Sequence, residues 1–312
     1  MEKYQYVFGP VPSRRLGNSL GVSPVPHKVC NYSCVYCQLG RTDKMTNRRE
    51  EYFLLDEILQ EFQQALADEV PFDVVTVVGE GEPTLYSRLG ELLRGIKRLT
   101  EKPVAVITNS ALMSDAQVRS ELMAADIILP SIDAADEQTF KNIDRPYGRL
   151  NFNEITQGLA DFSHTFQGQI WAEIMLVAGI NDDDASLHKF KEMLKEIRYD
   201  RLYINAPVRP PAEADVCAPA PERIRRAAEL LGGISIDMLT SGGFYSDISD
   251  DYEAILSIIR RHPMNRFEIM GFLESRASAN AESMLERLAN DKRVEMIDYK
   301  GFTTFRMNSR GE

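Results

Sequence analysis

The sequence predicts an α/β fold: a partial, open parallel barrel of the (βα)6 type, followed by a small C-terminal domain. From about residue 50 to 240, short apolar runs alternate with amphipathic stretches of helical period. Strands and helices that alternate at this spacing form parallel strands joined by right-handed crossovers. The segment holds about six to seven such units, fewer than the eight of a closed barrel. An open barrel is therefore expected.

The expected elements follow one another without internal repeats. The strands are expected at Ser19–Ser23, Asp73–Val78, Val104–Thr108, Ile127–Ile132, Ile170–Val177, Arg201–Asn205 and Ile234–Met238. The helices are expected at Phe53–Ala67, Leu89–Leu99, Asp115–Ala124, Asn153–Phe162, Ala185–Ile197 and Pro221–Leu231. Sites in parallel sheets gather at the carboxyl ends of the strands. The loops that follow each strand are therefore the ones expected to carry function.

A change of composition marks the end of the predicted barrel. Residues 240–251 read TSGGFYSDISDD, which is typical of a linker. We predict a barrel over residues 1–240, a linker over 241–251 and a separate domain over 252–312. That domain is expected to contain helices Tyr252–Arg261, Arg266–Glu274 and Asn280–Ala289, and a hairpin of Val294–Ile297 with Thr303–Met307. Three helices and a two-stranded wing indicate a winged-helix-like domain.

Composition and charge restrict the class of protein. The chain has 312 residues, 44% of them hydrophobic, and contains no apolar run long enough to span a membrane. Its N-terminus lacks the apolar core of a secretory signal, so we expect a cytoplasmic protein that does not bind membranes. The net charge of −11 argues against a whole-surface affinity for nucleic acid.

Three of the four cysteines lie within eight residues, in the pattern C-x3-C-x2-C formed by Cys30, Cys34 and Cys37. Such clustering points to a metal in a reducing compartment. Three thiolates on a short loop can bind three irons of a cubane cluster and leave the fourth iron open to a chelating ligand. A structural zinc site is the alternative. It requires four ligands, and the remaining cysteine, Cys217, stands in a distant proline-rich loop.

The motif, with Tyr36 directly before the third cysteine, resembles the signature of the radical S-adenosylmethionine superfamily. The flanking segments FGPVPSRRLG (8–17) and QLGRT (38–42) are similar to the branch of iron–sulfur oxidoreductases related to the archaeal wybutosine-synthesis enzyme. The resemblance covers about residues 8–240. It implies one [4Fe–4S] cluster and S-adenosylmethionine as cofactors, and reductive cleavage to a 5′-deoxyadenosyl radical that abstracts hydrogen from a substrate. It also implies an electron donor such as a flavodoxin or ferredoxin.

Further motifs at predicted strand ends resemble the cofactor site of this superfamily. VGEGEPTL (78–85) is similar to its GGEP motif, with Gly81 and Glu82 in place and Glu80 where glycine is commoner. Glycine permits close approach to a ligand, and Glu82 offers an acceptor for an ammonium group. Thr108 and Asn109 resemble the first residues of its TNG turn, with Ser110 replacing the glycine. The alternative is an ordinary strand–turn–helix connection.

Other polar residues near strand ends are weaker candidates for binding ribose hydroxyls or a carboxylate. They are Ser131, Asp133, Glu173, Asn181 and Asn205. Small polar residues at such places are also common helix caps. Arg209 is a candidate to hold an anionic substrate or the methionyl carboxylate, against the alternative of a solvated loop arginine. Arg14 and Arg15 invite a phosphate-binding interpretation, but surface arginines are common. No residue is assigned a catalytic role.

The resemblance has limits. The wybutosine enzyme carries a second cluster on additional cysteines, and this chain has only Cys217 to spare. A second cluster is therefore excluded within one chain, which argues against wybutosine synthesis and against branches that need auxiliary clusters. DNA binding is disfavoured as well, because residues 245–312 hold 10 Lys and Arg against 12 Asp and Glu.

Three hypotheses remain at this point. The first is a radical enzyme that acts on an unidentified organic molecule. The second is a tRNA- or protein-modifying radical enzyme whose C-terminal domain recruits the macromolecule. The third is an iron–sulfur redox sensor that reads DNA, which the acidic predicted helix Asn280–Ala289 disfavours. The substrate itself has no recognisable signature.

Overall fold

The computed structural model describes residues 4–236, 243–244, 246, 248–278, 281–299 and 302–308. Most of the chain forms one eight-stranded sheet in the order β1-β2-β5-β6-β7-β8-β9-β10. β1 pairs antiparallel with β2, and the other neighbours are parallel. Its strands are β1 (Val7–Ser13), β2 (Gly17–Val22), β5 (Val74–Val77), β6 (Val104–Thr108), β7 (Ile127–Pro130), β8 (Gln169–Met175), β9 (Arg201–Asn205) and β10 (Ile234–Ser235). β1 and β10 are the edges of the sheet, so it stays open within the described residues.

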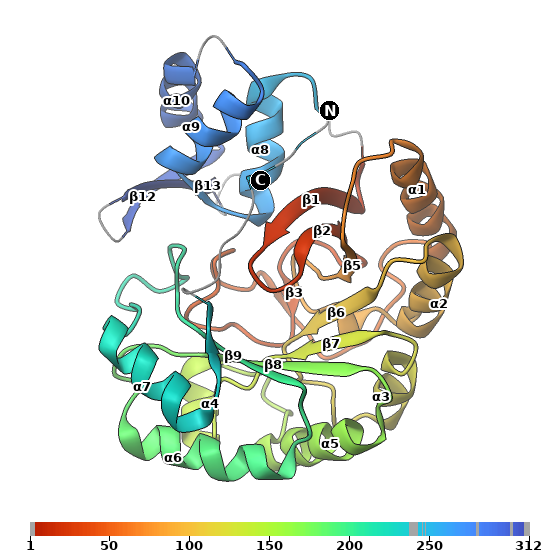
Figure 1. Cartoon of the computed structure of the whole chain (residues 1–312), viewed down its shortest axis with the longest axis vertical. Helices are drawn as coiled ribbons and strands as arrows, with labels where there is room; N and C mark the ends of the chain where they lie inside the picture. Colours follow the sequence, from red (N-terminus) through yellow and green to blue (C-terminus); the bar gives the residue numbers. More distant parts are fainter. Residues whose placement is uncertain are drawn as a thin grey trace.

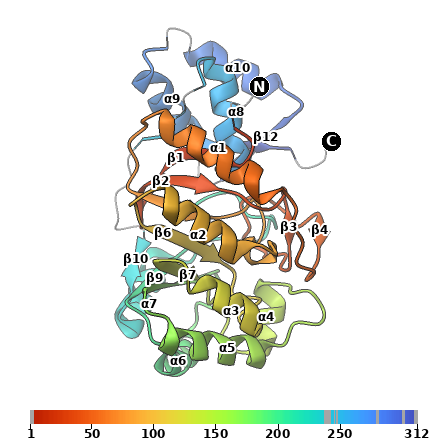
Figure 2. The same ribbon diagram turned by 90° about the vertical axis from the view of Figure 1, so that its right-hand side faces the viewer.

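Helices cover the outer face of this curved sheet, as the successive helices α1, α2, α3 and α5 show in Figures 1 and 2. The helices of this part are α1 (Leu55–Ala67), α2 (Leu89–Leu99), α3 (Ala116–Leu122), α4 (Glu137–Ile143), α5 (Phe152–Thr165), α6 (Asp184–Met193) and α7 (Pro221–Leu231). Two short 3-10 turns, η1 (Pro83–Leu85) and η2 (Leu194–Glu196), accompany them. Side chains cap the N-termini of α3, α4, α5 and α6: that of Asp115, for example, accepts a hydrogen bond from the N–H of Gln117 in α3. The predicted parallel α/β architecture is confirmed.

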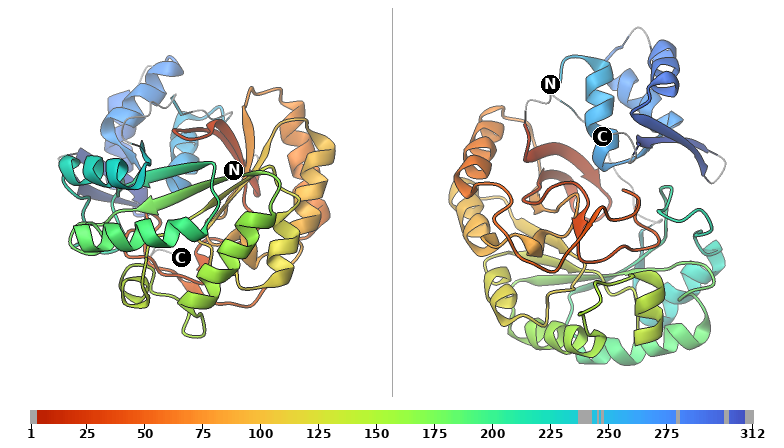
Figure 3. Two further views of the ribbon diagram at one scale, coloured as in Figure 1. Left: turned by 60° about the horizontal axis from the view of Figure 1, so that its bottom comes forward. Right: turned by 180° about the vertical axis from the view of Figure 1, so that it is seen from behind.

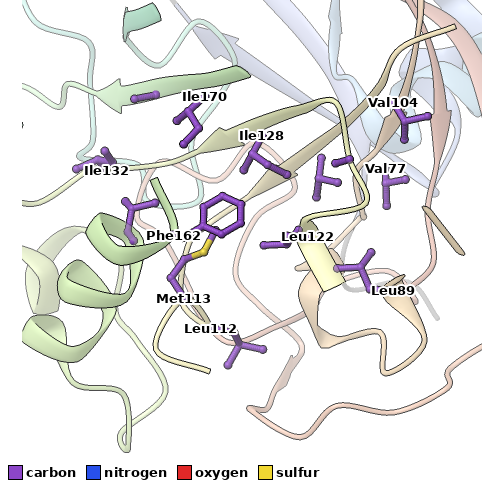
Figure 4. Packing of buried hydrophobic residues seen from close by; sticks show 14 of the residues in the cluster. Val77, Leu89, Val104, Leu112, Met113, Leu122, Ile128, Ile132, Phe162 and Ile170 are labelled. Atoms are coloured by element: carbon purple, nitrogen blue, oxygen red, sulfur yellow. The ribbon is translucent and has the colours of Figure 1, made fainter. Parts of the chain in front are cut away.

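Alternation along each strand divides the core into an outer and an inner layer. Val75 and Val77 of β5 belong to the apolar cluster between sheet and helices, whereas Val74 belongs to a second cluster on the inner face. In α2 the buried residues recur at helical spacing and meet this outer layer. Figure 4 shows the outer layer, with strand residues such as Ile128 beside helix residues such as Phe162. The inner cluster contains Leu16, Val74, Ala105, Ile127, Leu129, Trp171, Tyr203 and Ile236.

The C-terminal residues build a smaller unit with its own apolar core. Its elements are α8 (Asp251–Arg261), β11 (Met264–Asn265), α9 (Arg266–Ser275), α10 (Ala281–Asn290), β12 (Val294–Tyr299) and β13 (Phe302–Met307). The three strands form an antiparallel sheet in the order β11-β13-β12. Buried residues from helices and sheet, among them Tyr252, Leu273 and Phe305, form this core. The unit lies beside β1 at one end of the molecule (Figure 1).

Several elements of the structure were not predicted from the sequence. β1 contains Pro10 and Pro12, which lack an N–H donor, and is tolerated because it is an edge strand. α4, β11 and the small pair β3 (Val29–Cys30) and β4 (Lys44–Met45) are too short for a periodicity signal. Several predicted residues lie outside the described residues: the strand end at 237–238, four of the eleven linker residues (241, 242, 245 and 247), Asn280 at the start of a predicted helix, and the hairpin turn at 300–301. Within the described residues, no helix is long and apolar enough to cross a membrane.

Candidate functional site

The cysteine motif lies in the long connection between β2 and α1, which crosses the centre of the molecule in the right-hand view of Figure 3. Cys30 ends β3, and tight turns follow, in which the N–H of Cys37 donates to the carbonyl of Cys34 at 3.1 Å. All three cysteines are free thiols, partly exposed. They line one cavity of about 310 Å³. The short C-x3-C-x2-C spacing therefore brings three thiols to a common space.

Polar groups contact two of these sulfurs. The Sγ of Cys30 accepts from the N–H of Tyr32 and from Nδ2 of Asn109, both at 3.5 Å. The Sγ of Cys34 lies 3.6 Å from Oδ1 of Asp144, to which the protonated thiol donates. Asn109 comes from the loop after β6, so the thiols are held by segments far apart in sequence.

The environment of the thiols favours their protonated form when no metal is bound. Burial raises the pKa of Cys30 to about 12, and the Glu82 carboxylate adds to this. Burial and Asp144 raise the pKa of Cys34, and burial raises the pKa of Cys37 despite the nearby Lys28 ammonium. A metal that binds thiolates must therefore displace protons, which its positive charge makes possible.

The donor set fits an iron–sulfur cluster better than a single ion. Among the residues that the structure describes, no three His, Cys, Asp or Glu side chains converge as a single-ion site. A cubane cluster does not require such convergence, because each thiolate binds a different iron. Zinc would need a fourth ligand. Cys217 is exposed and is not part of the cavity wall.

Gly81, in the loop after β5, packs directly against the backbone of the cysteine segment. A Cβ at this position would lie 1.9 Å from the carbonyl oxygen of Val29, which makes glycine obligatory in this backbone arrangement. The adjacent N–H of Glu82 donates to the same carbonyl at 3.1 Å. The close approach predicted between Gly81 and a ligand is thus, in this structure, an approach to the backbone of Val29 in the cysteine segment.

Glu82 is buried, with 2% of its surface exposed, and its carboxylate accepts four hydrogen bonds from the protein. The donors are the N–H and hydroxyl of Thr84, the hydroxyl of Thr108 at 2.7 Å and the N–H of Asn109 at 2.8 Å. Burial raises its pKa, while these bonds oppose the shift. Glu82 therefore connects the loop after β5 with the end of β6 and the loop that follows it, at the wall of the cavity.

The remaining strand-end residues divide into two groups. Ten of the twelve predicted cofactor and metal residues line the cavity: Cys30, Cys34, Tyr36, Cys37, Gly81, Glu82, Thr108, Asn109, Ser131 and Asn205. Asp133 and Asn181 are not among the residues that line this cavity, and their contact with a ligand stays a prediction. The Asn181 amide is fully buried and bonds to the carbonyls of Asp133 and Met175 and to the N–H of Val177.

Asp133 instead supports Tyr36. It accepts from the Tyr36 hydroxyl and from the N–H of Met175, the latter at 2.8 Å. Burial raises the pKa of Asp133 to about 7. The polar pattern after β7 and β8 had no feature that distinguished a ligand-facing side chain from a supporting one.

The structure explains why Glu80 and Ser110 can replace the glycines of the superfamily motifs. Ser110, in place of glycine, adopts the left-handed conformation with φ of 67°, and its hydroxyl donates to the carbonyl of Ser131 at 2.9 Å. Glu80, also in place of glycine, lies 3.6 Å from Nδ1 of His27 and 3.3 Å from Nε of Arg261. Burial acts against the charged form, but these two partners hold the pKa of Glu80 below its ordinary value.

Sequence reasoning missed other residues of this region. The Asn31 amide oxygen accepts from Nδ2 of Asn109 at 2.8 Å, and Lys28 is buried in the cavity wall. Arg261 comes from the C-terminal unit, 181 positions after Glu80, so no local pattern connects the two. These residues become visible as parts of one site only when the chain is folded.

Comparison with known proteins gives consistent results. A sequence profile described as the Radical SAM superfamily matches residues 25–190. A UPF0026 protein from Methanocaldococcus jannaschii is 31% identical over 309 residues, covering 96% of this chain and 95% of that protein. A protein from Brachyspira hyodysenteriae named GTPase Obg is 41% identical over 202 residues, which is 65% of this chain. The match spans only 30% of the length of that relative.

The fold also has a counterpart among solved structures. A radical SAM methyltransferase from Sphaerobacter thermophilus superimposes with a TM-score of 0.50 at 16% identity. The match covers 70% of this chain and 68% of that chain. At this identity the likeness concerns the fold alone.

Proposed function

The chain belongs to the radical S-adenosylmethionine superfamily, and on this premise we propose that it cleaves S-adenosylmethionine reductively with one [4Fe–4S] cluster. Enzymes of this superfamily use that cluster and S-adenosylmethionine. The observation that carries the proposal is the trio of free thiols that line one cavity together with polar residues from the ends of the parallel strands. We further propose that an unidentified organic molecule is the substrate.

In this proposal, Cys30, Cys34 and Cys37 ligate the cluster. The amide of Asn109 orients Cys30, because it donates to that sulfur and is itself fixed by Glu82 through its backbone. Tyr36, Thr108, Ser131 and Asn205 are proposed to contact S-adenosylmethionine, together with the backbone at Gly81. The buried, fully bonded carboxylate of Glu82 supports a positioning role for that residue.

With the cluster held by Cys30, Cys34 and Cys37, the two cofactors would supply reductive cleavage of S-adenosylmethionine, to methionine and a 5′-deoxyadenosyl radical, for abstraction of hydrogen from the substrate. A one-electron donor of the flavodoxin or ferredoxin class is proposed to supply the electron. The chain's own part is to hold the reacting groups and to exclude water. The partly buried walls of the cavity suit that task.

We also propose three parts along the chain: a barrel over residues 1–240, a linker over 241–251 and a winged-helix-like domain over 252–312. The order α8-β11-α9-α10-β12-β13 and the separate apolar core support this assignment. The domain packs on the barrel, since the Tyr299 hydroxyl donates to the carbonyl of Pro207 at 2.8 Å. Docking of this kind favours a structural contribution over DNA reading.

A tRNA- or protein-modifying enzyme is the alternative retained from the sequence. In that case the C-terminal domain would recruit the macromolecule. Nucleic-acid binding would reveal itself by an affinity that falls steeply with salt. A radical enzyme acting on a small molecule would be indifferent to added tRNA.

The decisive experiment is anaerobic reconstitution with iron and sulfide, reduction, addition of S-adenosylmethionine and an assay for 5′-deoxyadenosine. We expect about four irons per chain and cleavage that disappears in Cys34→Ala. Cys217→Ala is the matched control, because this exposed thiol lies outside the cavity and its loss leaves cleavage unchanged.

Two outcomes would contradict the proposal. Folded protein that binds iron but neither cleaves S-adenosylmethionine nor changes its spectrum with it would exclude this chemistry. Equal loss of iron and cleavage in the Cys34 and Cys217 variants would show that the three-cysteine assignment is wrong.

A further inference from the structure

A second and larger cavity adjoins the cysteine cavity. Its volume is about 540 Å³, within the range of small-molecule sites. Gln38, Glu80, Asn205 and Arg209 line both cavities, so the two spaces share a wall. A molecule in the larger cavity would lie next to the site proposed for S-adenosylmethionine.

Two parts of the chain enclose this cavity. The barrel contributes residues of β1, β2 and β6 and of the loop after β9. The C-terminal unit contributes Arg261 and His262 at the end of α8 and Glu268 in α9. Because the C-terminal unit lies beside the β1 edge of the open sheet, it forms part of the cavity wall instead of leaving the lumen exposed (Figure 1).

The charged residues that the structure describes on this wall carry an excess of positive charge. Among them, four arginines (Arg14, Arg15, Arg209 and Arg261) line the cavity, against the two carboxylates Glu80 and Glu268. A third carboxylate, Glu173, pairs with Arg15 and leaves the balance positive. This balance is opposite to the net charge of −11 of the whole chain. A cavity lined by positive charge raises the local concentration of anions inside it, even in an acidic protein.

Carboxylates hold the arginines in place from both sides of the junction. Arg209 of the barrel pairs with Glu268 of the C-terminal unit, and Arg261 of that unit pairs with Glu80 of the barrel at 3.3 Å. The Arg261 guanidinium also lies 4.5 Å from the ring centre of Phe8. A guanidinium has five N–H donors in a fixed fork, and the hydrogen bond of Arg209 to Glu268 comes from one nitrogen, Nη1.

The pKa of His262, which also lines the cavity, is affected by the same two arginines. Burial, followed by Arg209 and Arg261, lowers the pKa of His262 to about 4. The imidazole is therefore neutral at physiological pH, although it lines the cavity. An anion between the two arginines would offset their effect on this ring.

We propose that the larger cavity binds the substrate, and that the substrate is a small organic anion whose carboxylate or phosphate is held between Arg209 and Arg261. This inference rests on the proposed function, because it places the substrate beside S-adenosylmethionine. It also gives the C-terminal unit a role in the substrate site, since Arg261 belongs to that unit. Enclosure by both units favours a small molecule over a macromolecule.

Calorimetric titration of the reconstituted, unreduced protein with S-adenosylmethionine present tests the inference. The probes are succinate, glycerol 3-phosphate and uncharged glycerol. We expect one anion to bind at a single site and glycerol not to bind. The two anions distinguish the carboxylate from the phosphate. Arg209→Gln and Arg261→Gln should each weaken the anion at least tenfold.

Two variants keep the test specific. Arg94→Gln removes the same charge from the exposed surface of α2 and should change the affinity less than twofold. Arg209→Lys keeps the charge but not the fork, and should retain more binding than Arg209→Gln. Circular dichroism checks that each variant is folded. In the parent protein, the NMR-detected pKa of His262 should rise when the anion binds.

Several results would overturn the inference. Absence of binding for both anions would do so, as would affinities equally affected by Arg94→Gln. Weaker binding of S-adenosylmethionine in the arginine variants, with unchanged anion affinity, would assign these arginines to the cofactor. Salt-sensitive binding of tRNA without any small-anion binding would point to a macromolecular substrate. In each case, cleavage of S-adenosylmethionine is assayed separately and decides the proposed function independently.

Discussion

The cysteine cavity and the junction with the C-terminal unit are held together by different kinds of interaction. Around the cysteines, neutral hydroxyl, amide and backbone donors surround buried carboxylates, as in the network of Glu82 with Thr108 and Asn109. At the junction, full charges meet across two units, as in the pairs Arg209–Glu268 and Arg261–Glu80. The first region is built from strand ends of a single sheet, the second from segments that belong to separate apolar cores.

This difference indicates a division of roles. Buried, saturated hydrogen-bond networks give rigid positioning, because each group that loses its partner becomes costly. The Arg209–Glu268 pair at the junction is partly exposed, so it contributes less to stability and its partners can be exchanged, whereas the Arg261–Glu80 pair is nearly buried. In the proposed function, the rigid region is the cofactor cavity and the partly exposed pair belongs to the wall of the proposed substrate cavity. Three changes test the contrast.

The largest effect is expected from Gly81→Ala. The new Cβ would meet the carbonyl oxygen of Val29 at 1.9 Å, so the loop must move away from the cysteine segment. We expect a loss of about 2–3 kcal/mol in the free energy of unfolding and at least tenfold weaker binding of S-adenosylmethionine. Urea unfolding and equilibrium dialysis measure the two effects.

Gly148→Ala is the control for this change, because no atom lies within 4 Å of the Cβ it would introduce. It should bind S-adenosylmethionine as the parent protein does. Equal behaviour of the two variants would mean that the cofactor loop is not rigid, and the contrast with the junction would fail.

An intermediate effect is expected from acid at the junction. The pKa of His262 is lowered from 6.5 to about 4, so the folded state disfavours its protonation. The unfolded chain binds the proton between these values, and stability that is fully present above pH 6.5 is lost as the pH falls towards 4. Between pH 6.5 and pH 5 the loss is about 2 kcal/mol. Urea unfolding of the cluster-free protein from pH 7.5 to 5, compared with a His262 variant, measures it.

Asp133, whose pKa is raised to about 7, changes the stability in the opposite direction over this range, so the contribution of His262 is read from the difference between the parent protein and a His262 variant. His262→Leu should lose less stability than the parent protein as the pH falls, whereas His188→Asn, at an exposed position of α6, should follow the parent protein. If the free energy of unfolding of the His262 variant depends on pH as steeply as that of the parent protein, His262 does not cause the loss of stability in acid.

The smallest effect is expected from the ion pair Arg209–Glu268. A double-mutant cycle with Arg209→Gln and Glu268→Gln isolates the coupling energy, and glutamine preserves the capping box that Glu268 forms with Asn265. We expect a coupling of about 0.5–1 kcal/mol, since the pair is only partly exposed. The pair Arg88–Glu91 on α2, more exposed, serves as the comparison and should couple less. Coupling above about 3 kcal/mol would place the junction among rigid, desolvated contacts.

The sequence by itself determined the alternation of strands and helices and the positions of the three cysteines. Several elements, such as α2 and β9, match the predicted boundaries to the residue. Periodicity and short-range spacing carry this information, because apolar residues must recur on the buried face. For the same reason, ten strand-end and motif residues that were expected at one site lie together on one cavity wall.

Only the tertiary structure decided which way the remaining polar side chains turn and what they meet. Asp133 and Asn181 look equivalent to Ser131 in sequence, yet they support the chain while Ser131 lines the cavity. Arg261 reaches Glu80 because two independently cored units pack together. Such contacts depend on strand register and on packing between residues more than a hundred positions apart, neither of which leaves a local pattern in the chain.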